Sequence, residues 1–317
     1  MQAPEVALCW AASTPWTQGH ANLGDSLSAV VVAALSGRLI RHFPFEAERT
    51  KLVAVGTIGD EIRNGTAVVW GTGVPSRREF STNSASTRYD VRAVRGPVSA
   101  RNYRSWGIQV PDVYGDPAWF VPSIIAEPAI KRFELGVIPH ISEVSAPRSD
   151  APSRDGLFRY AVDGADGAAV AIINTWHHAT WEGLLATVQL IRSCRRIVSR
   201  SFHGVVLAEA YGIPVLPLSE PVDSGDGVQM VSLTEPASVD ERVWEFYATG
   251  RRKSFPVYAQ SKTHRTDWQG VLRAVDRYWI PHQFDAEPLA AAFPLPLAYD
   301  PLTKEVASLE KLQKLTF

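Results

Sequence analysis

The sequence predicts an α/β fold that contains two Rossmann-like units. Short apolar segments recur along the chain and end in glycine or a hydroxyl residue, as in residues 51–55, which Gly56 and Thr57 follow. Segments with apolar residues at helical spacing alternate with them, a pattern typical of parallel sheets covered by helices. With 317 residues, of which 45% are hydrophobic, the chain is long enough for two domains with cores of their own.

The first unit is predicted to span residues 1–125. Residues 6–10 are expected to form its first strand, and a helix with one apolar face follows. We expect Asp25 to cap the N-terminus of this helix and Gly37 to end it. The other elements expected in this unit are strands at 51–55, 67–70 and 91–94, a helix between Pro97 and Gly107, and a strand that ends at 113–117.

The second unit is predicted to span residues 126–240, and residues 241–317 form a helical, proline-rich tail that is long enough to pack back on the first unit. The elements expected in the second unit are strands at 133–139 and 168–174, a loop at 148–167, a helix at 180–193, and a strand, turn, helix and strand at 196–218. In the tail, helical spacing is present at 241–247, 268–278 and 303–315.

The turn at residues 199–204 is the strongest candidate for chemistry. His203 lies at or near the start of a predicted helix, beside Ser199, Arg200 and Ser201. In α/β sheets such a turn lies at the carboxyl ends of the strands, where free backbone N–H groups and the helix dipole favour an anion. An imidazole there is suited to meet a phosphate or carboxylate, and the alternative is a hydrogen-bonded structural histidine.

Other predicted strand ends add candidates. Arg95 follows a strand and precedes a helix, so its planar guanidinium is suited to a bidentate contact with an anion, and the alternative is a solvated surface charge. Asp116 either takes part in catalysis or acceptor orientation, or forms a turn through its side chain. His140 is a candidate cleft residue, and Asp25 is a helix cap or an acceptor contact.

The composition argues against several classes of function. With 32 basic and 33 acidic residues the net charge is -1, so no overall field favours nucleic acid. Two cysteines, Cys9 and Cys194, offer neither a disulfide scaffold nor a thiolate cluster for zinc, and no metal is implied. No apolar run approaches the roughly 20 residues that a membrane span needs, and we expect a cytoplasmic protein.

Together the motifs resemble those of the polysaccharide pyruvyl transferase family, especially the bacterial exopolysaccharide ketal pyruvyltransferases of the succinoglycan type. The resemblance covers about two thirds of the chain and rests on the order and spacing of the motifs. These are Asn22-Leu-Gly-Asp25, Val69-Trp-Gly-Thr-Gly73, Ala93-Val-Arg-Gly-Pro97, Val113-Tyr-Gly-Asp-Pro-Ala118, Gly136-Val-Ile-Pro-His140, and Ser199 to Gly204 followed by Ala208 to Pro214.

The resemblance implies a GT-B-like arrangement, in which two Rossmann-like domains face each other across the cleft that holds the site. The donor would be phosphoenolpyruvate, with no other cofactor required. The product would be a cyclic pyruvate ketal on two hydroxyls of one sugar, usually within a lipid-linked oligosaccharide made at the cytoplasmic face of the membrane. A peripheral contact with that face is compatible with this function.

Ketal formation needs a general acid, and we assign this role to His203, with Asp116 as the second catalytic candidate. Donor contacts are expected from Arg95, Ser199, Arg200, Ser201, Gly204 and His140, and acceptor contacts from Asn22, Asp25 and Gly73. Many family members carry arginine two residues before the motif histidine. This chain has Ser201 there and Arg200 one step earlier, which leaves contact between Arg200 and the donor open.

Two other functions are weaker interpretations of the same motifs. A GT-B glycosyltransferase that uses a nucleotide sugar needs a carboxylate to hold the ribose, and Glu209 lies inside a predicted helix instead. A non-enzymatic scaffold that binds a sugar or a protein would leave Arg95 and His203 in unrelated places. The enzyme hypothesis therefore predicts that these two side chains approach a common site.

Overall fold

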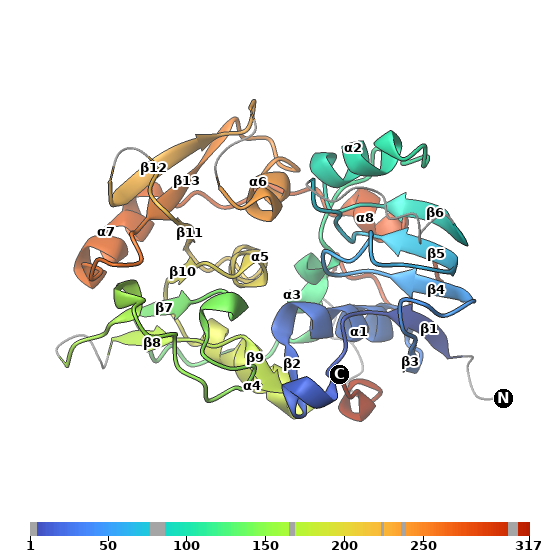
Figure 1. Cartoon of the computed structure of the whole chain (residues 1–317), viewed down its shortest axis with the longest axis horizontal. Coiled ribbons are helices and arrows are strands. Elements are labelled where there is room, and N and C mark those ends of the chain that lie inside the picture. Colours follow the sequence, from blue (N-terminus) through green and yellow to red (C-terminus); the bar gives the residue numbers. More distant parts are fainter. Residues whose placement is uncertain (1–4, 77–85, 165–168, 223–224, 236–238, 304–309) are drawn as a thin grey trace.

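The strands form two mainly parallel sheets with helices packed against them, as the computed structural model of the chain shows for residues 5–76, 86–164, 169–222, 225–235, 239–303 and 310–317 (Figure 1). The five-stranded sheet has the order β3-β1-β4-β5-β6, and every pair in it is parallel. The six-stranded sheet has the order β12-β13-β11-β10-β7-β8, in which β12 runs antiparallel to β13 and the other pairs are parallel. The prediction of an α/β fold with parallel sheets is confirmed.

The strands of the first sheet are β1 (Val6–Cys9), β3 (Ile40–His42), β4 (Thr50–Val53), β5 (Gly65–Trp70) and β6 (Thr87–Ala93). Those of the second are β7 (Leu135–Ile138), β8 (Val170–Ile172), β10 (Ile197–Ser199), β11 (Val215–Ser219), β12 (Gly227–Ser232) and β13 (Ser254–Ala259). A short antiparallel pair joins β2 (His20–Asn22) to β9 (Trp176–His178).

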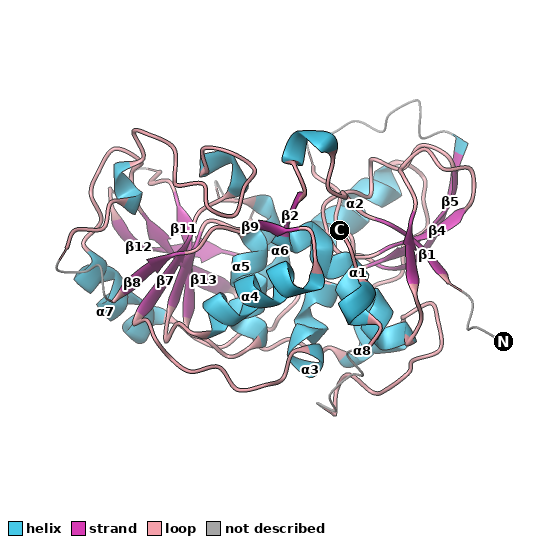
Figure 2. Ribbon diagram, turned by 90° about the horizontal axis from the view of Figure 1, so that it is seen from below, coloured by secondary structure: helices cyan, strands magenta, loops and turns pink. Residues whose placement is uncertain are grey.

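The helices are α1 (Leu23–Ser36), α2 (Pro97–Ser105), α3 (Val121–Ile124), α4 (Trp181–Arg192), α5 (Phe202–Ala210), α6 (Glu241–Tyr247), α7 (Trp268–Tyr278) and α8 (Glu287–Ala291). Figure 2 shows α1, α4 and α5 gathered between the two sheets, and α7 on the outer side of the second sheet. Because α1 is packed on all sides, every residue in it except Asp25 is buried. None of the helices in the described part of the chain is long and apolar enough to cross a membrane.

The structure corrects two expectations in the first unit. No strand forms at residues 113–117, where Tyr114 makes a single bridge to Val94, because Pro117 has no N–H to continue a ladder and instead opens the 3-10 helix η3 (Pro117–Phe120). Asp25 is not the N-cap of α1, because the helix begins two residues earlier and Asn22 occupies that position. Asp25 lies in the first turn of the helix instead.

The segment expected to be a helical tail also contributes strand β13, which lies between β11 and β12 in the second sheet. Beyond it the chain returns to the first sheet, where α8 lies beside β5 and β6 (Figure 1). The indole Nε1 of Trp70 donates to the carbonyl of Leu289 at 2.9 Å, and Ala298 N donates to the carbonyl of Leu35 at 2.6 Å. Of the closing segment expected to be helical, residues 304–309 lie outside the described residues, and residues 312–314 form one 3-10 turn.

Candidate functional site

The candidate site lies at the N-terminus of α5, at the carboxyl end of β10. Ser199 ends the strand and its Oγ donates to the carbonyl of Ser201 at 2.7 Å, while Arg200 N donates to the carbonyl of Ile138 at 2.8 Å. Ser201 is extended, so the helix starts after it, and its side chain does not cap the helix. Gly204 lies against the turn, because a Cβ there would be 2.4 Å from Ser199 Oγ. Ser199 and Gly204 therefore build the turn that positions its neighbours.

His203, the second residue of α5, faces a carboxylate from the first unit. Its Nε2 lies 3.6 Å from Oδ2 of Asp116, and the two side chains are 12% and 0% exposed. Asp116 uses its other oxygen, Oδ1, to accept from Ala118 N at 2.9 Å as the N-cap of η3. Neither Oδ2 nor the imidazole Nε2 has a hydrogen-bond partner among the residues that the structure describes. The pair therefore leaves two buried polar atoms available to a ligand or a proton.

The imidazole of His203 also touches the first turn of α1. A Cβ on Gly24 would lie 2.1 Å from Nδ1 of His203, a distance that no real contact allows. Glycine at position 24 is therefore what lets the N-termini of α1 and α5 approach each other at this point.

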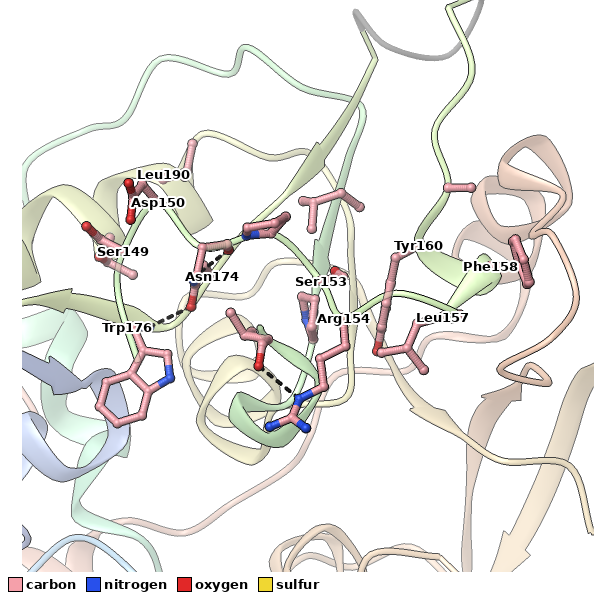
Figure 3. A pocket seen from close by; sticks show the side chains of 18 of the residues that line it. Ser149, Asp150, Ser153, Arg154, Leu157, Phe158, Tyr160, Asn174, Trp176 and Leu190 are labelled. Atoms are coloured by element: carbon pink, nitrogen blue, oxygen red, sulfur yellow. Dashed lines mark hydrogen bonds between the residues drawn. The ribbon is translucent and has the colours of Figure 1, made fainter. Parts of the chain in front are cut away.

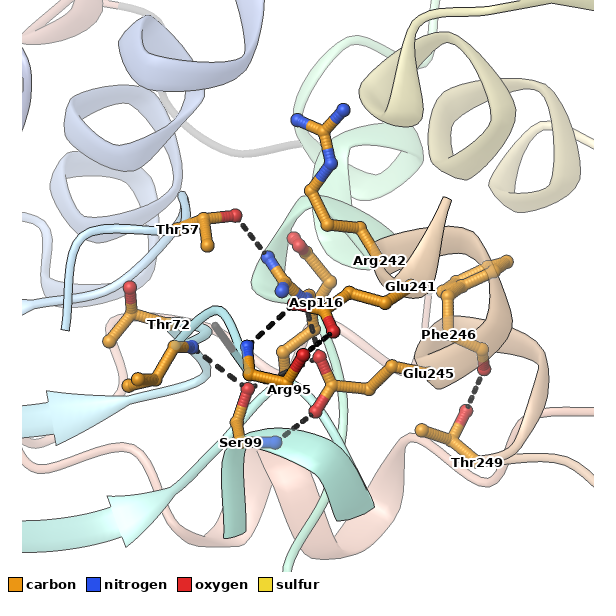
Figure 4. Close-up of polar contacts among 12 residues, drawn as sticks. Thr57, Thr72, Arg95, Ser99, Asp116, Glu241, Arg242, Glu245, Phe246 and Thr249 are labelled. Atoms are coloured by element: carbon orange, nitrogen blue, oxygen red, sulfur yellow. Dashed lines mark hydrogen bonds and ion pairs between the residues drawn. The ribbon is translucent and has the colours of Figure 1, made fainter. Parts of the chain in front are cut away.

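Arg95 lies in a buried polar network (Figure 4). Its Nε donates to Oε2 of Glu245 at 2.9 Å and its Nη1 to Oγ1 of Thr57 at 2.5 Å, and the side chain is 1% exposed. Its third nitrogen, Nη2, is buried without a partner in the described part of the chain. A Cβ on Gly73 would lie 2.2 Å from the guanidinium carbon, so glycine there makes room for Arg95. The carboxylate of Glu245 also accepts hydrogen bonds from the backbone N and the hydroxyl of Ser99.

The aromatic ring of Phe202 connects these groups. The guanidinium of Arg95 lies 5.1 Å from the ring centroid, that of Arg242 lies 5.9 Å from it, and the ring of His203 packs edge-on at 4.9 Å. We call Arg95, Asp116, Phe202, His203 and Glu245 the inner cluster. It joins two loop residues of the first unit to residues of α5 and α6, so Arg95 and His203 approach one common ring.

A second, more open feature adjoins the inner cluster, and we call it the outer pocket. It has a volume of about 470 Å³. It is lined by His140, Ser142, Glu143, Arg154, Asp155, Leu157, Arg200, Asp240, Arg242 and Lys262. Figure 4 shows Arg242 extending from α6 toward the space between α1 and α5. Its guanidinium binds Asp240 with two nitrogens, at 2.6 Å from Nη2 and 3.0 Å from Nε.

The carboxylates of the outer pocket are largely engaged by other groups. Glu143 accepts from Arg159, from the hydroxyl of Tyr160 at 2.6 Å and from His140 N at 3.1 Å. In contrast, Nε of Arg200 is buried without a partner among the residues described. The outer pocket therefore offers cationic groups that its own carboxylates do not satisfy, which suits a small polyanion.

The pKa values of groups in this area follow from burial and the arginines. Burial raises the pKa of Asp240, yet the hydrogen bonds and charge of Arg242 outweigh it and lower that pKa to about 2. Burial, with the charge of Arg242, lowers the pKa of His140, which favours its neutral form. Burial raises the pKa of Asp25 above its ordinary value, against the opposing hydrogen bond from Asn22 and the charges of His203 and Arg242.

The residues predicted from the sequence are thus divided between neighbouring places. Arg95, Asp116 and His203 belong to the inner cluster, with Gly73 behind Arg95. His140 and Arg200 line the outer pocket, which Arg95 and His203 do not. The acceptor candidates Asn22, which is the N-cap of α1, and Asp25, in its first turn, lie together, with Nδ2 of Asn22 donating to Oδ2 of Asp25 at 2.9 Å.

Among the charged residues that sequence reasoning missed here are Arg154, Arg242, Glu245 and Lys262. The only signal for any of them was the segment Trp244-Glu-Phe-Tyr247, in the helix that carries Arg242 and Glu245. Arg154 and Lys262 lie on loops without a motif.

Two other features bear on the nucleotide-sugar alternative and on metal binding. Glu209 is buried and accepts from the hydroxyl of Tyr247, the indole of Trp279 and His282 N, so it has no free oxygen directed toward a ribose. Among the described residues, no group of His, Cys, Asp or Glu is arranged to hold a metal ion.

Comparison with known proteins gives one match. The family model described as polysaccharide pyruvyl transferase matches residues 22–220. No curated protein and no solved structure matches the chain. The matched range contains the inner-cluster residues Arg95, Asp116, Phe202 and His203, and it ends before Arg242 and Glu245.

Proposed function

The chain belongs to the polysaccharide pyruvyl transferase family, and we propose that it transfers the three carbons of phosphoenolpyruvate to two hydroxyls of one sugar, which forms a cyclic pyruvate ketal and releases phosphate. The observation that carries this proposal is the arrangement of the inner cluster beside an arginine-lined pocket at the N-terminus of α5. The cluster supplies a buried imidazole and carboxylate, and the pocket supplies charge for an anionic donor.

His203 acts as the general acid in this proposal. Protonation of the methylene carbon C3 of phosphoenolpyruvate makes C2 electrophilic, and the first sugar hydroxyl adds there and gives up its proton. The second hydroxyl then displaces phosphate at C2 and closes the ring, so one hydroxyl proton is balanced by the new methyl group and the other leaves with phosphate or solvent. The carboxylate of Asp116, 3.6 Å from Nε2, stabilises the charged imidazole that donates the proton.

The donor is bound by two sets of cations. Arg242 and Arg200 of the outer pocket bind its phosphate, and the buried Nη2 of Arg95 donates to its carboxylate. Planar guanidinium groups suit both anions, because they pair two N–H donors with two oxygens. The open N-terminus of α5 adds backbone N–H groups to the phosphate site.

We further propose that the two sheets are the cores of two Rossmann-like domains, arranged as in GT-B enzymes with the site between them. The first domain spans residues 1–125, and the second begins at residue 126 and extends past the expected boundary at 240, because its sheet includes β13. The acceptor is a sugar of a lipid-linked exopolysaccharide repeat unit. The protein then works in the cytoplasm, in peripheral contact with the membrane face that carries this substrate.

One experiment tests the function directly. The protein is incubated with phosphoenolpyruvate and lipid-linked glycans, and released phosphate is measured together with the product mass. We expect equal amounts of phosphate and pyruvylated glycan. A thermal-shift series separates the donor classes, because ligand binding raises the melting temperature. A shift with UDP- or GDP-sugars and none with phosphoenolpyruvate would contradict the proposal.

A further inference from the structure

A second cavity opens next to the outer pocket, at the carboxyl ends of β7 and β8 (Figure 3). Its volume is about 650 Å³, and its walls are the loop at residues 149–161, the outer side of α4 and the indole of Trp176 on β9. We call it the Trp176 pocket. Nothing in the donor chemistry above uses it, although it is within the usual size range for a small-molecule site.

The lining of the Trp176 pocket differs chemically from that of the outer pocket. Ile172, Leu190 and Tyr160 supply apolar surface, and Ser149 and Ser153 supply hydroxyl groups. A pyranose has the same mixture, with apolar C–H faces and a rim of hydroxyls, and the flat face of an indole matches the C–H face. A phosphate-rich ligand would fit poorly, because Arg154 at the border is the one cation among the described residues that line this pocket.

The wall that holds Trp176 is fixed before any ligand binds. The side-chain amide of Asn174 donates to the carbonyls of Arg148 and Ala151 at 2.7 and 3.1 Å, and its Oδ1 accepts from Trp176 N at 2.9 Å. Figure 3 shows the bond between Oδ1 of Asn174 and the backbone of Trp176, which holds the strand that carries the indole. A preformed platform of this kind lowers the entropy cost of binding.

The pocket adjoins the proposed donor site, and the strand that carries Trp176 is paired with the segment before α1. Arg154 and Leu157 line both it and the outer pocket. On the other side, Trp176 pairs in the β2–β9 ladder with Asn22, whose amide donates to Asp25 beside His203. A saccharide on Trp176 can therefore extend past Arg154 and Leu157 toward the outer pocket.

We propose that the Trp176 pocket is the acceptor-glycan subsite, in which a neutral pyranose of the acceptor stacks on Trp176. This inference rests on the proposed function for its meaning, but sugar binding can be measured without turnover. The pocket holds the part of the glycan that is not modified, so it determines which acceptor is used.

The test uses lactose, maltose and cellotetraose as probes, with binding followed by saturation-transfer NMR and titration calorimetry. We expect at least one of them to bind the wild type, and Trp176→Ala to weaken that binding about tenfold, which Trp176→Phe partly restores. Ala186→Trp, at an exposed position of α4 that lines the pocket, should fill the space and block the sugar while Trp176 is intact. Tyr278→Ala is the matched control, because it removes an exposed aromatic ring on α7 outside the pocket.

The thermal shift given by phosphoenolpyruvate should be unchanged in all four variants. Wild-type protein that binds none of the three sugars, or sugar binding that survives both Trp176→Ala and Ala186→Trp, would overturn the subsite. Absence of a thermal shift with phosphoenolpyruvate in the wild type would instead count against the proposed function, so the two failures are distinguishable.

Discussion

The inner cluster and the neighbouring outer pocket differ in how their charged groups are paired. In the inner cluster, Arg95 and Glu245 are 1% and 0% exposed and are paired at 2.9 Å. In the outer pocket, Arg242 is paired with Asp240, but Nε of Arg200 has no partner in the described chain. A buried charge must be paired to be tolerated, whereas a pocket for an anion must leave charge unpaired.

This difference predicts which property each region controls. Changes in the inner cluster should alter the rate of the chemical step or the free energy of unfolding, because its members are fixed and desolvated. Changes in the outer pocket should alter the affinity for the donor. They should have little effect on the free energy of unfolding, because its cations line an open pocket.

The largest expected effect is that of His203→Gln. Glutamine keeps much of the volume but cannot deliver a proton, so we expect kcat to fall by about 10²- to 10⁴-fold with a small change in KM for phosphoenolpyruvate. Steady-state phosphate release measures both constants. His264→Gln is the control, since that exposed imidazole binds Asp226 at 2.7 Å outside both regions. Wild-type kcat in a folded His203→Gln protein would show that His203 is not the general acid.

Arg95→Ala should be the most costly change for stability. It leaves the carboxylate of Glu245 buried without its cation, which we expect to lower the free energy of unfolding by about 3–5 kcal/mol. Urea denaturation measures this. The double variant Arg95→Met, Glu245→Gln should regain most of the stability and still show a raised KM for phosphoenolpyruvate. Arg265→Ala, which breaks an exposed pair with Asp163, should change stability by less than about 0.5 kcal/mol. Equal changes in the free energy of unfolding for Arg95→Ala and Arg265→Ala would show that the buried pair contributes no more to stability than the exposed one.

Gly24→Ala tests the placement of His203 without removing any functional group. The new methyl would lie 2.1 Å from Nδ1, so the imidazole must move away from Asp116. A displacement of about 1 Å can cost on the order of 10²-fold in rate, and we expect a loss of that size in kcat. Gly164→Ala is the control, because a Cβ there meets no atom within 4 Å. Matching activities for the two alanine variants would show that the rate does not depend on this contact.

Much of the fold could be predicted from the sequence, because the long elements carry strong local signals. Thr180 begins the helix predicted at 180–193 and caps the N-terminus of α4, and Gly37 ends α1 as expected. The missed strands are short and depend on distant partners. The pair β2–β9 joins residues about 155 positions apart, and β13 carries Pro256, which argues against a strand when the sequence is considered alone.

The site was predictable only in part for a related reason. His203, Arg95 and Asp116 follow strands or precede helices, and the parallel sheets bring such positions together. The partner of Arg95 is Glu245, 150 residues later, and no local pattern reports it. The same holds for Arg242, which a helix of the second half directs toward α1 and α5.

The smallest expected effect is on donor binding by the outer pocket. One charged hydrogen bond contributes about 1.5–3 kcal/mol, so Arg200→Ala and Arg242→Ala should each raise KM for phosphoenolpyruvate by about tenfold or more. Because these cations lie at an open surface, added KCl should raise the wild-type KM more steeply than that of either variant. Phosphate release at several salt concentrations measures both effects, with Arg265→Ala as the control. If both variants keep the wild-type KM and salt response, the donor is bound by the inner cluster alone, and the outer pocket has another ligand.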